Sequence, residues 1–219
     1  MQTPSPTYWI DQAVHKRYRN ARLSTFEISN ASQAAAVDSC RSYIEQFKVH
    51  LSEGESLMLI GPKGTGKDHL MIAVCKAICE RYRRPDGRMP PEVAGNARFV
   101  DGVTTLDRLR DATFDRADHP ERIIRALMIP PLLAISDPIP PTGALKETDQ
   151  KNLFKLINGR YSRQMPIAAT INVASRKELE ERAGPQIADR MLDRAVVIRC
   201  NWESYRATSK PQTKVRIGT

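Results

Sequence analysis

The sequence predicts an α/β fold in which a five-stranded parallel sheet is flanked by helices. Segments with helical periodicity alternate along the chain with short, largely apolar runs of the kind that form buried strands. Such alternation favours a parallel sheet with helices on both faces. A glycine-rich loop directly follows the first run, at the strand end where sheets of this class bind ligands. The predicted strands are Leu57–Ile60, Ala97–Val100, Leu132–Ile135, Ile167–Ile171 and Ala195–Cys200.

The first 50 residues precede the predicted sheet and form an arm and a helix. Residues 1–25 are polar, basic and aromatic, and they predict an arm or a short helix. Apolar residues at three- and four-residue steps then predict a helix from Ser32 to about Val49. A turn at Glu53-Gly54-Glu55 leads into the first strand.

The predicted core domain, residues 51–206, contains the sheet and its helices. A helix that follows the glycine-rich loop has an apolar face and stops near a turn at 84–87. The other predicted segments are a helical stretch at 104–127, broken around 118–120, an irregular Pro-rich loop at 138–143, and a helix at 149–161. The basic residues 207–219 predict a flexible tail.

Composition indicates a soluble, cytoplasmic, globular protein. The 219 residues are 41% hydrophobic and 27% charged, enough for one domain with a sizeable core. No stretch approaches the ~20 apolar residues that span a bilayer, so no membrane partner is expected. The four cysteines predict buried free thiols in a reducing compartment. A net charge of +9 favours a polyanionic partner such as nucleic acid.

The segment from Gly61 to Asp68 matches the phosphate-binding pattern G-x-x-x-x-G-K. Its glycines allow backbone N–H groups to point at phosphate oxygens, and the following helix adds its positive N-terminal end. Lys67 supplies a charge for the β- and γ-phosphates of ATP. The strand before it and the helix after it are the expected context. The predicted ATP-binding residues are Gly61, Pro62, Lys63, Gly64, Thr65, Gly66, Lys67 and Asp68, with His69 next to them.

A second acidic residue is expected at the end of another buried strand, where P-loop ATPases hold magnesium. The strand Leu132–Ile135 is followed by Ser136-Asp137, so one carboxylate stands where many ATPases have two. Asp137 is therefore either the metal-side acid or the group that activates water. The plainer alternative is that Asp137 caps a turn before Pro138.

Two positions that converge on the metal carry unusual residues. Asp68 replaces the usual Ser or Thr after the loop lysine, and Ser136 replaces a usual acid. The pair could be an exchange that keeps one carboxylate and one hydroxyl near Mg²⁺. Two independent losses in a weak ATPase is the competing interpretation.

The chain resembles the DnaC/IstB-like branch of AAA+ ATPases, which are bacterial helicase loaders and transposition helper ATPases. The resemblance is carried by Gly64-Thr65-Gly66-Lys67-Asp68-His69-Leu70, Thr170-Ile171-Asn172, Gln186-Ile187-Ala188-Asp189-Arg190-Met191 and Asn201-Trp202-Glu203-Ser204-Tyr205-Arg206. It implies an AAA+ core with little or no C-terminal lid.

The resemblance also implies roles for single residues. Asn172 resembles sensor 1, which positions the attacking water, and Arg190 resembles the arginine finger that acts in a neighbouring subunit, with Arg194 as the alternate. Arg206 resembles a second sensor. The implied cofactors are ATP and Mg²⁺.

The partners implied by the resemblance are single-stranded DNA, a replicative helicase or a transposase, and further copies of this chain assembled with ATP. Arginine contacts to backbone phosphates provide affinity without reading sequence, and Tyr82 could stack a base. The arginines expected to contribute are Arg81, Arg83, Arg84, Arg88, Arg108, Arg110, Arg116, Arg122 and Arg125.

Three functions remain open from the sequence. The first is a DNA-associated AAA+ ATPase of replication or transposition. The second is a small-molecule or nucleotide kinase, which shares the phosphate loop but needs an acceptor pocket and has no use for an arginine from a neighbour. The third is a non-hydrolysing module in which ATP only scaffolds a complex.

Overall fold

The computed structural model describes residues 5–82, 97–112, 119–140 and 142–208. Its centre is a five-stranded sheet in the order β2-β3-β4-β1-β5, with every neighbouring pair parallel. The strands are β1 (Ser56–Ile60), β2 (Ala97–Asp101), β3 (Leu132–Ser136), β4 (Ile167–Ile171) and β5 (Ala195–Arg199). All five predicted strands are therefore confirmed.

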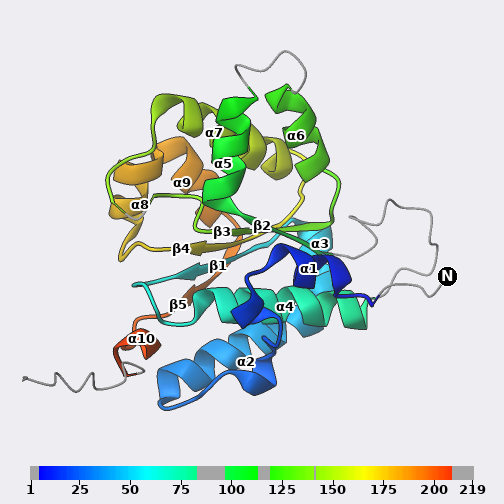
Figure 1. The fold of residues 1–219 in the computed structure, drawn as a ribbon, viewed down its shortest axis with the longest axis vertical. Helices are drawn as coiled ribbons and strands as arrows, with labels where there is room; N and C mark the ends of the chain where they lie inside the picture. The colour runs from blue at the N-terminus through cyan, green and yellow to red at the C-terminus, as the bar shows by residue number, and fades with distance from the viewer. Residues whose placement is uncertain (1–4, 83–96, 113–118, 141, 209–219) are drawn as a thin grey trace, which may run out of the picture.

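Helices cover both faces of the sheet in two layers (Figure 1). One layer contains α5 (Gly102–Asp111), α6 (Pro120–Leu127), α7 (Glu147–Tyr161), α8 (Arg176–Ala183) and α9 (Pro185–Leu192). The other contains α1 (Tyr8–Ala13), α2 (Ala31–Glu45) and α4 (Lys67–Arg81). Shorter elements are α3 (Phe47–Glu53), two 3₁₀ turns at Lys16–Tyr18 and Leu23–Thr25, and α10 (Tyr205–Thr208) after β5.

The side chains of β1 alternate between the two layers, as the pleat of a strand requires. Leu57 and Leu59 pack in the core beneath α2 and α4, whereas Met58 and Ile60 pack beneath α7 and α9. Every residue of β1, β3 and β4 is buried. This burial on both faces is the reason that these strands read as continuous apolar runs in the sequence.

The predicted helix from Ser32 to Val49 is two helices. Asn30 caps α2 by accepting a hydrogen bond from the backbone N–H of Gln33, whose side chain accepts one from Asn30 in return. The chain turns at Gln46, and α3 ends at Gly54, which has a left-handed φ of 69°. The apolar periodicity continues across the break, which is why it gave no sign of two helices.

The N-terminal segment contains a short helix, α1, which is one of the two forms predicted for it, and it packs on the core. Ile10, Val14 and Ala21 are buried in the hydrophobic cluster that contains α2 and α4. The fully buried Lys76 of α4 forms an ion pair with Asp11, with 2.6 Å between Nζ and Oδ1. The boundary predicted at residue 50 stays a prediction, but the hydrophobic core extends across it.

Other expectations fall partly outside the described residues. The break predicted at 118–120 is confirmed in that α5 and α6 are separate helices, and α7 begins two residues before the predicted start at Asp149. The turn at 84–87 and most of the tail at 207–219 lie outside the described residues. All four cysteines are buried and free. No helix in the described segments is long and apolar enough to cross a membrane.

Candidate nucleotide-binding site at the carboxyl edge of the sheet

The predicted phosphate loop lies between the end of β1 and the start of α4. Gly61, Gly64 and Gly66 have φ values of 145°, 83° and 84°, a region in which side chains other than glycine are strained. A Cβ at Gly61 would lie 2.2 Å from the carbonyl oxygen of Cys200, so the loop also needs glycine for space. The three glycines therefore stand at positions where the backbone of this loop requires glycine.

The segment Asn201–Arg206 packs directly on this loop. Trp202 donates from Nε1 to the carbonyl of Thr65 over 2.9 Å, and the backbone N–H of Tyr205 donates to the carbonyl of Gly64 over 3.0 Å. The two motifs are far apart in the sequence but form one packed unit.

Lys67 is almost fully buried at the centre of the loop. Its Nζ donates to the carbonyls of Gly61 (2.8 Å) and Pro62 (2.7 Å) and to Oδ1 of Asn172 (2.9 Å). Burial lowers the pKa of the Lys67 amine, and the charges of Asp137 and Asp68 oppose that effect. These three acceptors hold the ammonium group of Lys67 at the carboxyl edge of the sheet.

Asp137 and Asn172 lie at the ends of β3 and β4 and are in contact. Nδ2 of Asn172 donates to Oδ1 of Asp137 over 2.6 Å. Because β3, β4 and β1 are neighbours in the sheet, their carboxyl ends bring Asp137, Asn172 and the lysine loop together. Asp137 has a positive φ of 45°, a strained conformation of the kind that clusters at functional sites. Desolvation and the nearby Asp68 carboxylate raise the pKa of Asp137 to about 6.

The carboxylate of Asp68 accepts hydrogen bonds from hydroxyl groups on three different elements. Oδ1 accepts from Ser136 (2.9 Å) and Thr170 (2.8 Å), and Oδ2 accepts from Tyr18 (3.4 Å). The two unusual residues, Asp68 and Ser136, are therefore adjacent, as the exchange hypothesis requires.

The donors at this point are of the kind that magnesium selects. Mg²⁺ is commonly held by one or two carboxylates together with water and substrate phosphates. Asp68 and Asp137 supply carboxylates, and Ser136 and Thr170 supply hydroxyl oxygens. Among the described residues no group of three or more His, Cys, Asp and Glu side chains is arranged to hold a metal ion. The residues therefore fit Mg²⁺ that arrives with a nucleotide.

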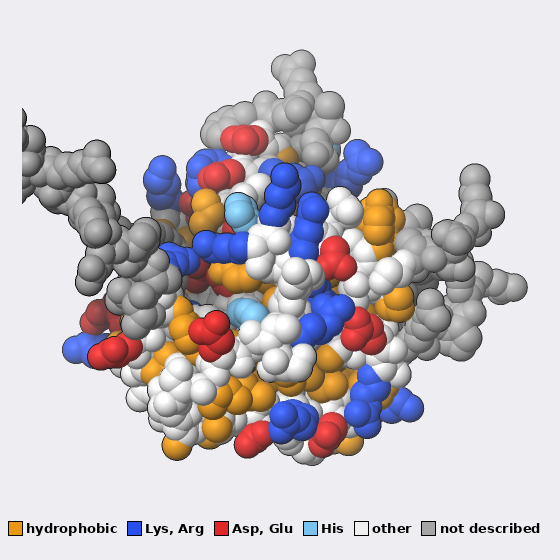
Figure 2. Space-filling view, turned by 60° about the horizontal axis from the view of Figure 1, so that its bottom comes forward, with side chains coloured by type: hydrophobic (Ala, Val, Ile, Leu, Met, Phe, Trp, Pro, Cys, Tyr) orange, Lys and Arg blue, Asp and Glu red, His pale blue; other side chains and the backbone are white. Residues whose placement is uncertain are grey.

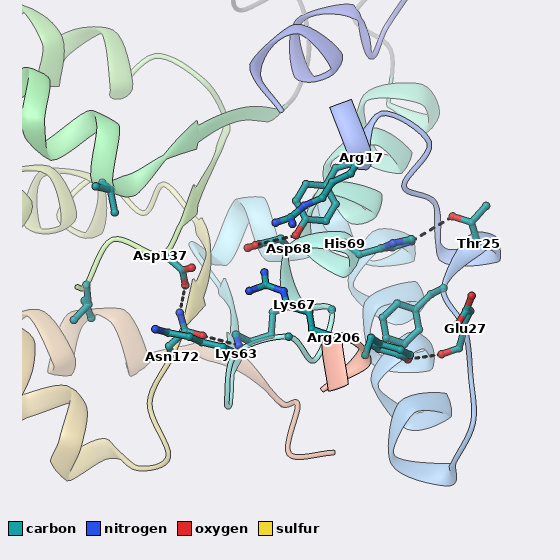
Figure 3. A pocket seen from close by; sticks show the side chains of 17 residues that line it. Arg17, Thr25, Glu27, Lys63, Lys67, Asp68, His69, Asp137, Asn172 and Arg206 are labelled. Atoms are coloured by element: carbon teal, nitrogen blue, oxygen red, sulfur yellow. Dashed lines mark hydrogen bonds between the residues drawn. The ribbon is translucent and has the colours of Figure 1, made fainter. Parts of the chain in front are cut away.

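A cavity of about 840 Å³ opens over the loop. In Figure 3, Lys67, Asp68, Asp137 and Asn172 gather on one side of it, and Arg206 lies nearby. The side chain of His69 points away toward Thr25, with 3.3 Å between Nε2 and Oγ1 (Figure 3). The residues that line the cavity include Arg17, Tyr18, Thr25, Phe26, Glu27, Lys63, Gly64, Gly66, Lys67, Asp68, His69, Asp137, Asn172, Tyr205 and Arg206.

Three of the residues predicted to bind ATP do not line the cavity. Gly61 and Pro62 instead contribute carbonyls to Lys67. Thr65 is fully buried, and its hydroxyl donates to the carbonyl of Pro62 over 3.1 Å. Gly61, Pro62 and Thr65 therefore stabilise the loop through these contacts and do not form the wall of the cavity.

Arg190 is not near this cavity in its own chain. Its Nε donates to Oδ1 of Asn158 over 2.6 Å, and its guanidinium lies over the rings of Phe154 and Tyr161. It lines a second hollow with Ser56 and Ile167, the first residues of β1 and β4. Arg190 therefore lies toward the amino edge of the sheet, away from the cavity over the loop.

The arginines predicted to contact DNA are divided between the layers. Arg81 ends α4 in one layer, whereas Arg108, Arg110, Arg122 and Arg125 belong to α5 and α6 in the other. In Figure 2, basic side chains are interspersed with acidic ones on the face shown. Arg110 is paired with Asp149 over 2.8 Å. The remaining predicted positions, Arg83, Arg84, Arg88 and Arg116, lie outside the described residues.

Tyr82 is engaged within the fold. Its hydroxyl donates to the carbonyls of Ile44 and Glu45, both over 2.9 Å, and its ring packs against Phe47. The prediction that Tyr82 stacks a base overlooked these partners, because sequence distance hides the contact between α2 and the end of α4.

Sequence reasoning missed the contribution of Thr170 and of the N-terminal segment. Thr170 precedes Asn172 by two residues, a spacing that directs both side chains to the same side of a strand, so the pattern could have identified it. Arg17 and Tyr18 line the cavity from about 50 residues away in sequence. No local pattern marks such a contact.

The chain matches the family model of IstB-like ATP binding proteins over residues 26–213. It is 21% identical over 193 residues to the replicative helicase loader DnaC of Escherichia coli strain K12, covering 87% of this chain and 71% of DnaC. It is also 28% identical over 164 residues to the ATP-binding protein of insertion sequence IS5376 from Geobacillus stearothermophilus, covering 71% of this chain and 57% of that protein.

Solved structures agree in fold. The crystal structure of the DnaC helicase loader superposes with a TM-score of 0.70 at 23% identity, covering 84% of this chain and 99% of that one. The replication initiator DnaA bound to AMPPCP and single-stranded DNA has a TM-score of 0.63 at 15% identity, covering 84% and 50%. The fold is that of AAA+ P-loop proteins, which confirms the predicted fold class. With the family match over most of its length, the chain belongs to the IstB-like ATP binding protein family.

Proposed function

We propose that this protein is an ATPase of DNA replication or transposition that binds magnesium-ATP in the cavity over residues 61–68. The observation that carries the proposal is the chain of contacts from Lys67 through Asn172 to Asp137 at the ends of three adjacent strands. The ammonium group of Lys67, the amide of Asn172 and the carboxylate of Asp137 then face the same cavity.

Each group has a distinct task in this proposal. Lys67 exchanges its bonds to the Gly61 and Pro62 carbonyls for bonds to phosphate oxygens. Asn172 and Asp137 hold and orient the attacking water, with Asp137 as the acceptor of its proton. Mg²⁺, when bound, would neutralise phosphate charge, and with Asp137 acting on the water, Asp68 and Ser136 are the residues that would hold the ion.

The position of Arg190 supports a site that is completed by a second copy of the chain. A finger that cannot reach its own cavity contributes only when a neighbour binds beside it. We infer that copies assemble with ATP on single-stranded DNA, with a replicative helicase or a transposase as the protein partner. One relative is named a helicase loader, which supports a replicative helicase as the partner. Another is named an insertion-sequence protein, which supports a transposase.

A non-hydrolysing ATP-dependent scaffold is the second candidate. The single acid at the end of β3 favours it, because Ser136 occupies a position where many ATPases have a second carboxylate. In that case nucleotide binding alone, without hydrolysis, would control whether copies of the chain assemble.

The test compares binding and turnover in Lys67→Ala and the unmodified protein. Calorimetry should detect ATP binding that Lys67→Ala abolishes, because the backbone alone lacks the charge for the γ-phosphate. Phosphate release should rise with protein concentration and with single-stranded DNA. Binding without release under all these conditions would select the scaffold, and unchanged affinity in Lys67→Ala would reject the site.

A further inference from the structure

The guanidinium of Arg182 bridges the two loops that carry Asp137 and Asn172. Arg182 lies near the end of α8, with 11% of its side chain exposed. Nη1 donates to the carbonyl of Asn172 over 2.8 Å, and Nη2 donates to the carbonyl of Pro140. One planar group thus joins the residue after β4 to the loop after β3.

Further contacts fix this group in place. Nη1 also donates to Oε1 of Glu178 over 2.9 Å, and Oε2 of Glu178 accepts from the backbone N–H of Ala174 over 2.7 Å. The backbone carbonyl of Arg182 accepts from the N–H of Leu145 over 2.8 Å. Both strand-end loops are therefore tied to α8 by Arg182.

The loop after β3 has a backbone tie to β4 at Asp137, whose N–H donates to the carbonyl of Thr170 over 3.1 Å, and the residues beyond Asp137 need further support. Pro138 and Pro140 have no N–H, so this part of the loop after β3 cannot hold itself through backbone donors at those positions. Asp137 adopts a left-handed conformation that persists only when its surroundings hold it. The 2.6 Å contact between Asn172 and Asp137 depends on the relative position of the two loops.

We propose that Arg182 is a positioning residue that aligns Asn172 with Asp137. It touches neither the cavity-lining atoms of Lys67 nor those of Asp68, so its effect on nucleotide passes through the two loops. The proposal rests on the proposed function for the role of the aligned pair, but the alignment itself is a property of the free protein. A lysine cannot replace it fully, because two carbonyls in different loops need the fork of a guanidinium.

The experiment uses Arg182→Ala and Arg182→Lys in the full chain, with Lys177→Ala as the control. Lys177 lies on the same helix with 86% of its side chain exposed. The first readout is the Asn172 side-chain amide signal in ¹⁵N NMR spectra of the nucleotide-free protein, assigned with Asn172→Asp. It should shift and exchange faster with water in Arg182→Ala, shift less in Arg182→Lys, and stay unchanged in Lys177→Ala.

The second readout separates binding from turnover. ATP affinity of Arg182→Ala should change little, whereas kcat should fall on the order of 10²-fold, the usual cost of misplacing a reacting group by about 1 Å. Arg182→Lys should recover part of the loss and provides the measurement if the alanine variant does not fold.

The outcomes distinguish this proposal from the proposed function. If the unmodified protein releases no phosphate, the ATPase assignment fails, but the amide signal still tests Arg182. An unchanged Asn172 signal in a folded Arg182→Ala protein would overturn the positioning role. Equal losses in ATP affinity and kcat would also overturn it, since they would indicate general loosening of the fold.

Discussion

At the scale of single residues, the unusual feature is a carboxylate at position 68 surrounded by hydroxyl groups. A carboxylate that accepts hydrogen bonds from Ser136 and Thr170 is satisfied in a way that a threonine there would not be. The arrangement favours the exchange of Asp68 and Ser136 over two unrelated losses, because each residue is now the partner of the other.

A double-mutant cycle tests the exchange. Asp68→Thr should weaken the magnesium dependence of ATP binding, because it removes the carboxylate of the pair. Ser136→Asp should place two carboxylates side by side, and their repulsion should weaken ATP binding. The double variant should bind magnesium-ATP at least as well as the unmodified protein. Calorimetry with and without magnesium measures all four proteins, and strict additivity would mean that the residues share no metal.

The raised pKa of Asp137 predicts a pH dependence of stability. The protonated form is favoured in the folded protein, so the stabilisation it brings is present below the ordinary carboxyl pKa of 3.8 and is lost as pH rises through about 6. The Asp137→Asn variant has no carboxyl group at this position, so it does not lose this stabilisation as the pH rises. Its free energy of unfolding relative to the unmodified protein should therefore increase from pH 4 to pH 7.

Urea unfolding at several pH values measures this difference. Asp38→Asn is the control, because 68% of the Asp38 side chain is exposed and its change should leave the profile unaltered. Parallel profiles for Asp137→Asn and the unmodified protein would contradict the predicted burial effect.

At the scale of elements, a buried ion pair fastens the N-terminal segment to α4. Lys76 is fully buried, and its Nζ contacts Asp11 of α1 and donates to the carbonyl of Arg19 over 2.5 Å. The same segment brings Arg17 and Tyr18 to the wall of the cavity. The docking of α1 and the shape of the candidate site are therefore linked through α4.

The two ends of this pair should differ in their effect on stability. Asp11→Ala leaves a buried ammonium group without its counter-charge and should lower the free energy of unfolding by roughly 3 kcal/mol. Lys76→Met fills the same space with an apolar chain, and the Asp11 carboxylate, which is 28% exposed, still accepts a hydrogen bond from the Thr7 hydroxyl over 2.7 Å. The free energy of unfolding should therefore fall less in Lys76→Met than in Asp11→Ala. Urea titrations of both variants provide the comparison, and a larger loss in Lys76→Met would show that the carbonyl contacts of Lys76 dominate.

At the scale of the whole molecule, the candidate catalytic groups lie at opposite edges of the sheet. Lys67, Asp137 and Asn172 lie at the carboxyl edge, whereas Arg190 lies near the amino edge beside Ser56 and Ile167. Only an assembly in which one copy's amino edge meets another copy's cavity can bring them together.

Mixing two inactive variants tests assembly. Arg190→Ala should keep ATP binding and lose hydrolysis by roughly 10³-fold or more, the usual contribution of an arginine finger. Adding Lys67→Ala protein should restore activity, since each variant supplies the half that the other lacks. Arg163→Ala, a change at an exposed arginine after α7, is the control. This variant should hydrolyse ATP without added Lys67→Ala protein. Failure to restore activity when light scattering detects mixed assemblies would refute action in trans.

The net charge of +9 predicts salt-dependent binding to single-stranded DNA. The logarithm of affinity should fall linearly with the logarithm of salt concentration, through release of counterions from the strand. Charge reversal of Arg83 and Arg84 together should weaken binding to all sequences alike. Fluorescence anisotropy with ATP present measures both effects, and salt-insensitive binding would count against phosphate contacts.

The sequence by itself determined the strands, the phosphate loop and the residues that follow β3 and β4. These features depend on local chemistry: continuous burial selects apolar runs, and left-handed backbone selects glycine at positions 61, 64 and 66. The family was also visible, because its motifs lie in contiguous stretches such as Asn201–Arg206.

Only the tertiary structure decided which distant groups meet. The strand order brings Asp137 and Asn172 to Lys67, and the fold of the first 25 residues brings Tyr18 to Asp68. The same holds for the bridge made by Arg182 and for the distance between Arg190 and the cavity. Such contacts arise from packing between elements, and packing leaves no periodic trace in the sequence around either partner.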